Sequence, residues 1–507
     1  MDLLSPAEAH GRNADDARRR VGVVDLGSNS VRLVIFEGLS RNPLPIFNEK
    51  AVLGLGRGLQ MTGRLNEEAI GPALTVMSRY FAVARAMGAD PVEVVATAAT
   101  RDAANGAEFI AALRARLPGI PIRVLSGEEE GAHSADGVLL GFPGADGILG
   151  DLGGGSLELV ELDAGRAGAA ASLPMGAIRL ADRAAGEVAK ARAIVEADLA
   201  RVPWLKRGAG RDLYLVGGAW RALARMHIAQ TGYPLSIVHH YVLPREEARD
   251  LAGVVAQAPR RTLEKMPGAP AKRLGDMPFA AVVLRRLLRA TGARRVVFSA
   301  NGLREGWYAR LLPADVRGAD PLLCAGRDLA ARFGREPELP PALRAWTDPL
   351  FEGEAPDQAA LREAACWIAD IGSHDHPDYR AEQGFYRVLR QPGVGLDHHQ
   401  RAFLALVVAL RYEAEASAPF LACARQLLDA DAQRRAEQLG AALRLAFTLS
   451  GGTPVLLAGT ALARHGGELR LRLVEGSGVF AGESVQRRLD ALAAALGLAA
   501  VVEVAGG

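Results

Sequence analysis

The chain carries one short sequence pattern twice, and this repeat constrains the fold more than any other feature. The stretch DLGSNSVRLV begins at Asp25, and the stretch DLGGGSLELV begins at Asp151. Both read D-L-G-x-x-S, then an apolar residue, a charged residue and Leu-Val, and each continues an apolar run. Small polar residues between two apolar runs predict a tight hairpin. Because each hairpin opens a segment of alternating strand and helix patterns, we predict a duplicated α/β domain.

The tips of both predicted hairpins suit a phosphate group. We expect the glycines of the second tip to adopt positive φ and to direct successive N–H groups at one anion; these are Gly153, Gly154 and Gly155. Short side chains add further donors: Ser28, Asn29, Ser30 and Ser156. Asp25 and Asp151 would repel a phosphate, so we expect Mg²⁺ between carboxylate and phosphate. The alternative is a pair of ordinary glycine-rich hairpins in which the aspartates only form turns.

The two copies differ at one charged position. The first has Arg32 where the second has Glu158. Strand alternation directs both side chains into the expected cleft. An arginine there can hold phosphate, whereas a glutamate can help to hold a metal ion or water.

Composition limits the classes of protein that remain. The 507 residues are 49% hydrophobic and 23% charged, which predicts about three soluble domains. A net charge of +2 argues against a general nucleic-acid-binding protein. The 3 cysteines form no C-x-x-C pair, so neither a disulfide framework nor a zinc site is indicated. No apolar run reaches the roughly 20 residues of a membrane helix, and we expect a cytoplasmic protein without a membrane partner.

The pattern along the chain predicts five parts. These are a flexible tail (1–20), two α/β domains (21–135 and 136–312), a helical domain (313–449) and a small α/β domain (450–507). Within them, the segment 335–357 has the prolines and glutamates of a linker, and 358–448 has a helical pattern. We expect a helix that begins at Asp102 and a strand at 455–458.

Several stretches of this chain resemble the exopolyphosphatase / guanosine pentaphosphate phosphohydrolase (Ppx/GppA) family. They are VGVVDLGSNSVRLVIF (21–36), ATAATRDAANGAEF (96–109), VLSGEEEGA (124–132), ILGDLGGGSLELVEL (148–162), and LVGGAWRALARM with SANGLREGWY (215–226 and 299–308). The resemblance implies two actin-like (RNase H-like, ASKHA) domains that face a cleft. It further implies an all-helical HD-like domain and then a small C-terminal α/β domain.

The same resemblance implies roles for individual residues. It implies that Glu130 is the general base and that Asp151 and Glu158 organise Mg²⁺ and water, with Asp25 as a further metal ligand. The implied phosphate contacts outside the hairpin tips are Arg32, Thr100, Arg101 and Arg304. In relatives that use nucleotides, the place of the Val-Gly-Gly segment 216–218 binds adenosine.

Two motifs have ordinary structural explanations. Ser126 and Glu129 fit a helix capping box, so Glu128 and Glu129 are expected to stabilise a helix start, and Glu130 lies one step further round. The Ser-His-Asp-His run at 373–376 contains the His-Asp pair of metal-dependent HD phosphohydrolases, but no histidine lies between His240 and His374. We therefore expect a metal-free helical domain.

The expected activity is Mg²⁺-dependent release of terminal phosphate from inorganic polyphosphate by a homodimer. Mn²⁺ is an alternative metal ion, and a monovalent cation such as K⁺ can also take part. Two other functions stay open. One is hydrolysis of guanosine pentaphosphate to ppGpp, and the other is a sensor that binds polyphosphate or ppGpp without catalysis.

Overall fold

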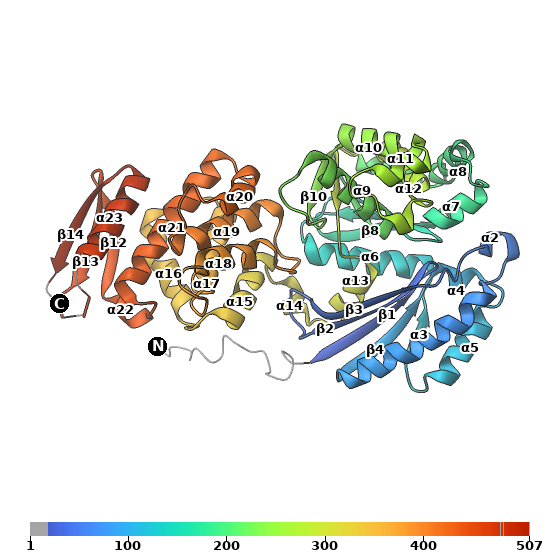
Figure 1. Ribbon diagram of the computed structural model, residues 1–507, viewed down its shortest axis with the longest axis horizontal. Helices are drawn as coiled ribbons and strands as arrows, with labels where there is room; N and C mark the ends of the chain where they lie inside the picture. The colour runs from blue at the N-terminus through green and yellow to red at the C-terminus, as the bar shows by residue number, and fades with distance from the viewer. Residues whose placement is uncertain (1–18, 477, 480, 506–507) are drawn as a thin grey trace. The chain divides into compact units, whose positions relative to one another are not determined.

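The computed structural model describes residues 19–476, 478–479 and 481–505, and the chain forms two compact units, Met1–Ala319 and Asp320–Gly507 (Figure 1). Nearly all of the tail predicted at 1–20 lies outside the described residues. The finer domain boundaries proposed from the sequence stay predictions. None of the helices in the described part is both long and apolar enough to cross a membrane.

The first half of unit 1 is built on a five-stranded sheet with the order β3-β2-β1-β4-β5. Its strands are β1 (Arg20–Leu26), β2 (Ser30–Glu37), β3 (Leu44–Val52), β4 (Ala89–Ala96) and β5 (Ile122–Val124). The pairs β1–β2 and β2–β3 are antiparallel, whereas β4 and β5 run parallel to β1. The apolar sides of β1 and β2 pack with Met77 and Tyr80 of α3 (Glu67–Ala86) in one core.

The second half repeats this arrangement. Its sheet has the order β10-β11-β9-β6-β7-β8, with β6 (Gly147–Leu152), β7 (Leu157–Asp163), β8 (Arg166–Leu173), β9 (Asp212–Val216), β10 (Tyr241–Pro244) and β11 (Arg295–Phe298). An antiparallel meander is again followed by parallel strands, so β8-β7-β6-β9-β11 matches β3-β2-β1-β4-β5. The duplication predicted from the repeat is confirmed, and the two halves have the predicted actin-like architecture.

Helices surround both sheets. Those of unit 1 besides α3 are α2 (Leu59–Thr62), α4 (Ala98–Asp102), α5 (Gly106–Arg116), α6 (Gly127–Gly141), α7 (Ala177–Arg183), α8 (Val188–Ala200), α9 (Gly218–Thr231), α10 (Arg245–Gln257), α11 (Arg260–Lys265), α12 (Met277–Thr291), α13 (Leu303–Ala309) and α14 (Ala314–Gly318). Helix α6 packs on β7 and β8, and α13 packs on both α6 and β1. These two helices therefore lie between the sheets. The expectation that a helix begins at Asp102 is wrong, because Asp102 ends α4 and the next helix begins at Gly106.

Unit 2 combines helices with a three-stranded sheet of order β12-β13-β14. Its elements are α15 (Pro321–Phe333), α16 (Leu339–Thr347), α17 (Pro356–Ile368), α18 (Arg380–Leu389), α19 (His398–Arg411), α20 (Ala422–Leu427), α21 (Ala430–Ser450), α22 (Pro454–Ala458), β12 (Thr460–His465), β13 (Glu468–Val474), α23 (Glu483–Leu496) and β14 (Ala499–Ala505). The helical segment predicted at 358–448 and the small α/β segment that follows it are confirmed.

Two local predictions in unit 2 are wrong, and proline explains both. The segment 335–357 contains α16 in place of a linker, because Pro340 and Pro341 lie in the first turn of that helix, where no intrahelical N–H bond is lost. Buried Leu343 and Trp346 then anchor this helix. The apolar run 455–458 is helical because Pro454 occupies the first position of α22. A short apolar run does not by itself distinguish strand from helix.

Candidate active site

The two repeat motifs form the same turn. The Gly27 amide donates to the Ser30 carbonyl at 3.1 Å, and the Gly153 amide donates to the Ser156 carbonyl at 3.0 Å. The strand register is equivalent as well, since Asp25 lies opposite Arg32 and Asp151 lies opposite Glu158. The one charged position at which the copies differ is therefore the position beside each aspartate.

The tips of the two hairpins lie against each other. A Cβ atom added to Gly155 would lie 2.8 Å from the Ser28 hydroxyl, and one added to Gly154 would lie 3.2 Å from Ser28 Cβ. Glycine is needed there for close approach. The predicted positive φ is wrong, because the three glycines of this tip are not among the positive-φ residues. In the described part of the chain no acceptor is recorded for the amides of Gly154 and Gly155, so both can face an anion.

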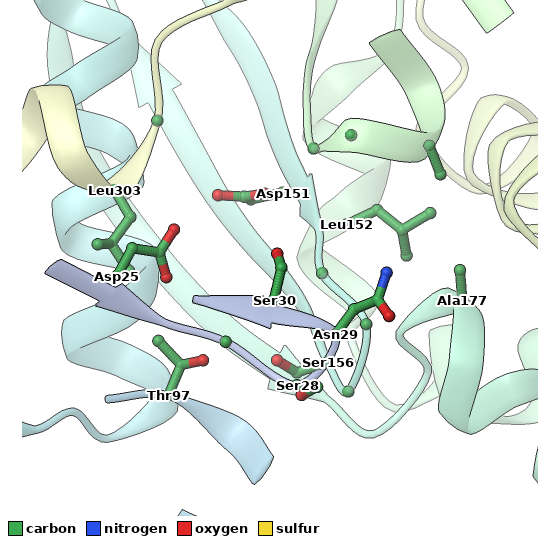
Figure 2. Close-up of a pocket in the computed structure, with 18 of the residues that line it drawn as sticks. Asp25, Ser28, Asn29, Ser30, Thr97, Asp151, Leu152, Ser156, Ala177 and Leu303 are labelled. Carbon is green, nitrogen blue, oxygen red and sulfur yellow. The ribbon is translucent and has the colours of Figure 1, made fainter. Parts of the chain in front are cut away.

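An open cavity lies between the two halves (Figure 2). The figure shows Asp25 and Asp151 at the same cavity and Ser28 beside Ser156. Most of the residues predicted from the sequence line it: Asp25, Ser28, Asn29, Ser30, Arg32, Glu130, Asp151, Gly153, Gly154, Gly155, Ser156 and Arg304. Three predicted residues, Glu158, Thr100 and Arg101, do not line it.

Glu130 reaches the cavity from the first turn of α6. The helix begins with the predicted capping box, in which the Glu129 amide donates to Ser126 Oγ at 3.1 Å and the Ser126 amide donates to Glu129 Oε2 at 2.7 Å. This cap sets the helical phase, and Glu130 is turned inward with only 8% of its surface exposed. Burial, reinforced by the charges of Glu158 and Asp151, raises the pKa of Glu130 well above the usual value. A carboxylate with a raised pKa suits a general base.

Three further carboxylates lie near Glu130: Glu158 is buried, whereas Asp25 and Asp151 are half-buried. Burial raises the pKa of Asp25 against the lowering effect of Arg304, whose Nε lies 3.9 Å from Asp25 Oδ2. Burial likewise raises the pKa of Asp151, which accepts a hydrogen bond from Ser134 Oγ. Burial and the charge of Asp151 raise the pKa of Glu158. The cleft thus concentrates acidic groups that favour either a proton or a cation.

Thr100 and Arg101 do not line the cavity themselves. The Thr100 hydroxyl is buried and has no hydrogen-bond partner in the described structure. Arg101 Nη1 contacts Glu130 Oε2 at 3.3 Å and the Leu125 carbonyl at 3.0 Å. Arg101 is therefore a neighbour of Glu130, and its contact with phosphate stays a prediction.

Three cationic residues that the sequence analysis did not single out also line the cavity: Lys50, Arg221 and Arg273. Lys50 lies opposite Arg32 in the β2–β3 register. Partial burial and the charge of Arg273, with those of three further arginines, lower the pKa of the Lys50 ammonium to about 8. Arg221 belongs to the LVGGAWRALARM stretch, so this motif could have indicated Arg221 as a site residue. Lys50 and Arg273 stand in segments with no motif, so only the folded structure brings them to the site.

The acidic residues of the cleft fit a hard divalent cation by their chemistry. Asp25 and Asp151 offer carboxylate oxygens to one cavity, and Mg²⁺ is commonly bound through one or two carboxylates together with substrate phosphate. Within the described ranges, no three His, Cys, Asp or Glu side chains are arranged as a complete metal cluster. Glu158 is held instead by Ser172 Oγ, which donates to its Oε1 at 2.9 Å.

Comparisons with known proteins identify the family and support the fold. Exopolyphosphatase 2 of Mycobacterium tuberculosis (strain CDC 1551 / Oshkosh) is 31% identical over an alignment of 318 residues, and the match covers 57% of this chain and 98% of that protein. A crystal structure of an exopolyphosphatase from Cytophaga hutchinsonii matches with a TM-score of 0.53 and 23% identity, and covers 58% of this chain and 98% of the other. The Aquifex aeolicus member of the Ppx/GppA family matches with a TM-score of 0.50 and 24% identity, over 58% and 97% of the two chains. These two structures support the fold alone.

Models of protein families cover both units. Residues 34–315 match the Ppx/GppA phosphatase family, and residues 322–502 match the C-terminal domain of exopolyphosphatases. The first match spans more than half of the chain and contains every residue that lines the cavity except Asp25, the first hairpin tip and Arg32, which precede it. The chain belongs to the Ppx/GppA phosphatase family.

Proposed function

We propose that this protein is an exopolyphosphatase, which hydrolyses the terminal phosphoanhydride bond of inorganic polyphosphate and releases orthophosphate. One observation carries the proposal: five cationic side chains line the cavity that also contains Glu130, namely Arg32, Lys50, Arg221, Arg273 and Arg304. Burial, reinforced by repulsion from neighbouring arginines of this set, lowers the pKa of Lys50 and of Arg221. An anion with several charges relieves this repulsion better than a single phosphate group does.

Under this proposal, each group has a role in the reaction. The amides of Gly154 and Gly155 and the serines of the two tips hold the terminal phosphoryl group. Glu130 accepts a proton from the attacking water, and Arg32 and Arg304 neutralise charge on the equatorial oxygens. The products are orthophosphate and a polyphosphate one unit shorter.

We propose Mg²⁺ as the cofactor, with Asp25 and Asp151 as the residues that would hold it. When bound, such an ion neutralises phosphate charge and polarises the phosphoryl oxygens. Asp25 and Asp151 themselves have two roles. They orient water near Glu130, and they exclude a second anion from the position next to the general base.

A nucleotide substrate is the second candidate, because Gly217 and Gly218 line the cavity at the start of α9. Guanosine pentaphosphate would place its ribose and base near these glycines. However, a Cβ atom on Gly218 would lie 2.5 Å from Arg273 Nη2, so a guanidinium already occupies the space above that glycine. This cation favours a further phosphate over an uncharged base.

One assay separates these functions. Purified protein is supplied with Mg²⁺ and with tripolyphosphate, long-chain polyphosphate or guanosine pentaphosphate, and released orthophosphate is measured. We expect the highest kcat/KM for polyphosphate. Faster release from guanosine pentaphosphate would favour the second candidate. Tight binding of polyphosphate without any release would show a sensor and would contradict the proposal.

A further inference from the structure

A chain of four charged side chains runs from Glu130 through Arg101 and Asp102 of the first half to Arg179 of the second half. Glu130 Oε2 lies 3.3 Å from Arg101 Nη1, and Arg101 Nε lies 3.1 Å from Asp102 Oδ1. The other oxygen of the same carboxylate, Asp102 Oδ2, lies 2.7 Å from Arg179 Nη2. Asp102 therefore binds two guanidinium groups at once, one from each half.

Arg179 is tied to the second phosphate-binding hairpin. It is the third residue of α7, and its amide donates to the Gly154 carbonyl at 3.1 Å. The preceding amides of this helix bond to the same tip, Ala177 to the Gly153 carbonyl at 3.0 Å and Ile178 to the Gly154 carbonyl at 3.1 Å. A movement of the tip is therefore transmitted to the backbone that carries Arg179.

The partners of Asp102 are largely shielded from solvent. The side chain of Arg179 is 11% exposed and that of Arg101 is 24% exposed, whereas Asp102 keeps 33%. A guanidinium in such a place needs an acceptor, because an unpaired buried charge is costly. Without Asp102, Arg101 would lose its Nε acceptor and keep only the Nη1 contacts with the Leu125 carbonyl and Glu130.

We propose that Asp102 is a positioning residue that couples the second phosphate-binding hairpin to the general base. When Arg179 and Asp102 join the two halves, Arg101 is held against Glu130 and the carboxylate of the base is directed into the cavity. The inference rests on the proposed function for its kinetic test only. Asp102 does not line the cavity and has no contact with substrate in this scheme.

The first experiment compares Asp102→Asn with the wild type in tripolyphosphate hydrolysis. We expect kcat to fall about 10- to 100-fold, the size of effect that follows from a displaced catalytic group, with KM changed less than about threefold. Glu108→Gln is the matched control, because Glu108 is an exposed carboxylate of the same half. A rise in KM with unchanged kcat, or no change at all, would overturn the inference. If Asp102→Asn does not fold, Asp102→Glu is measured with the same criteria.

A charge exchange separates positioning from simple attachment of the two halves. The double variant Asp102→Arg with Arg179→Asp restores the ion pair between the halves but places a cation beside Arg101. We expect its thermal midpoint to recover relative to either single variant, whereas kcat stays at least about tenfold below the wild type. Recovery of kcat to within threefold would show that Asp102 only fastens the halves together, and the inference would be wrong.

Hydrogen exchange gives a readout that does not need turnover. Tripolyphosphate should slow exchange in α7 and in residues 101–105 of the wild type, and none of residues 101–105 lines the cavity. In Asp102→Asn we expect slower exchange in α7 alone. Equal protection of both segments in the variant would overturn the inference. If the wild type releases no phosphate from any substrate, the proposed function is wrong. The hydrogen-exchange comparison then still tests whether Asp102 couples α7 to residues 101–105.

Discussion

The two hairpins of unit 1 share a backbone and differ in chemistry. Each closes with the same glycine-to-serine hydrogen bond, and each places a residue of the second strand opposite its aspartate. In the first half that residue is Arg32, and Lys50 stands beside it on the next strand. In the second half it is Glu158, which is buried and held by Ser172.

This difference shows how a duplicated fold can make an asymmetric site. The first hairpin adds positive charge to the cavity, whereas the second adds negative charge close to Glu130. Phosphate is attracted to one side, and a proton or a metal ion is favoured on the other. Two copies of either hairpin would supply only one of these two environments.

The largest effect should come from replacing Glu130, which lies near the acidic residues Asp151 and Glu158. Glu130→Gln keeps the shape of the side chain and removes the base, so we expect turnover to fall about 1,000- to 10,000-fold with polyphosphate binding retained. Orthophosphate release and equilibrium binding measure the two quantities. Glu128→Gln, on the exposed side of the same helical turn, is the control and should be nearly silent. If Glu130→Gln turned over at the wild-type rate, Glu130 would not be the general base.

The carboxylates on the acidic side of the cavity should also set the Mg²⁺ concentration that turnover requires. Asp151→Asn removes a charged oxygen ligand, and we expect about 100-fold slower turnover together with a higher Mg²⁺ concentration for half-maximal rate. Asp163→Asn, at the exposed far end of β7, serves as the control. A slower rate with an unchanged Mg²⁺ requirement would mean that Asp151 is not a metal ligand.

Removing a cation from the positively charged side of the cavity should weaken substrate binding. Arg32→Ala removes a hydrogen-bonding guanidinium, and we expect a loss of about 1.5–3 kcal/mol in kcat/KM, with KM raised and kcat lowered. Steady-state kinetics on tripolyphosphate provide the measurement. Arg85→Ala on the exposed side of α3 is the control. If Arg32→Ala has the kinetics of the wild type, the difference between the hairpins is structural at that position.

The smallest effect concerns the charge of Lys50. Since partial burial and the neighbouring arginines lower the pKa of Lys50 to about 8, the ammonium is charged below pH 8 and neutral above it. We expect KM to rise a few-fold as pH increases through that value, because one attraction for phosphate is lost. Lys50→Arg keeps its charge and should remove this rise, whereas Lys50→Met should have a high KM at every pH. The same alkaline rise in Lys50→Arg would assign it to another group.

The repeat was sufficient to predict the duplicated fold, because a hairpin depends on local residue types and on strand periodicity. The capping box at Ser126 was equally local, and it correctly predicted the start of α6. Predictions failed where neighbours in space decide the outcome. The helices at 339–347 and 454–458 depend on proline placement and on buried partners, and the glycines of the second tip serve contact with Ser28.

The chain's order of residues was enough to place Asp25, Arg32, Asp151 and Glu158 at equivalent points of two hairpins, because these positions follow from strand alternation and one repeated motif. It was not enough to find Lys50 and Arg273, which lie far from those motifs along the chain. Nor could it show that Arg101 contacts Glu130, or that Asp102 joins the two halves. These relations depend on how the halves pack, and only tertiary structure brings such distant charges within a few ångströms.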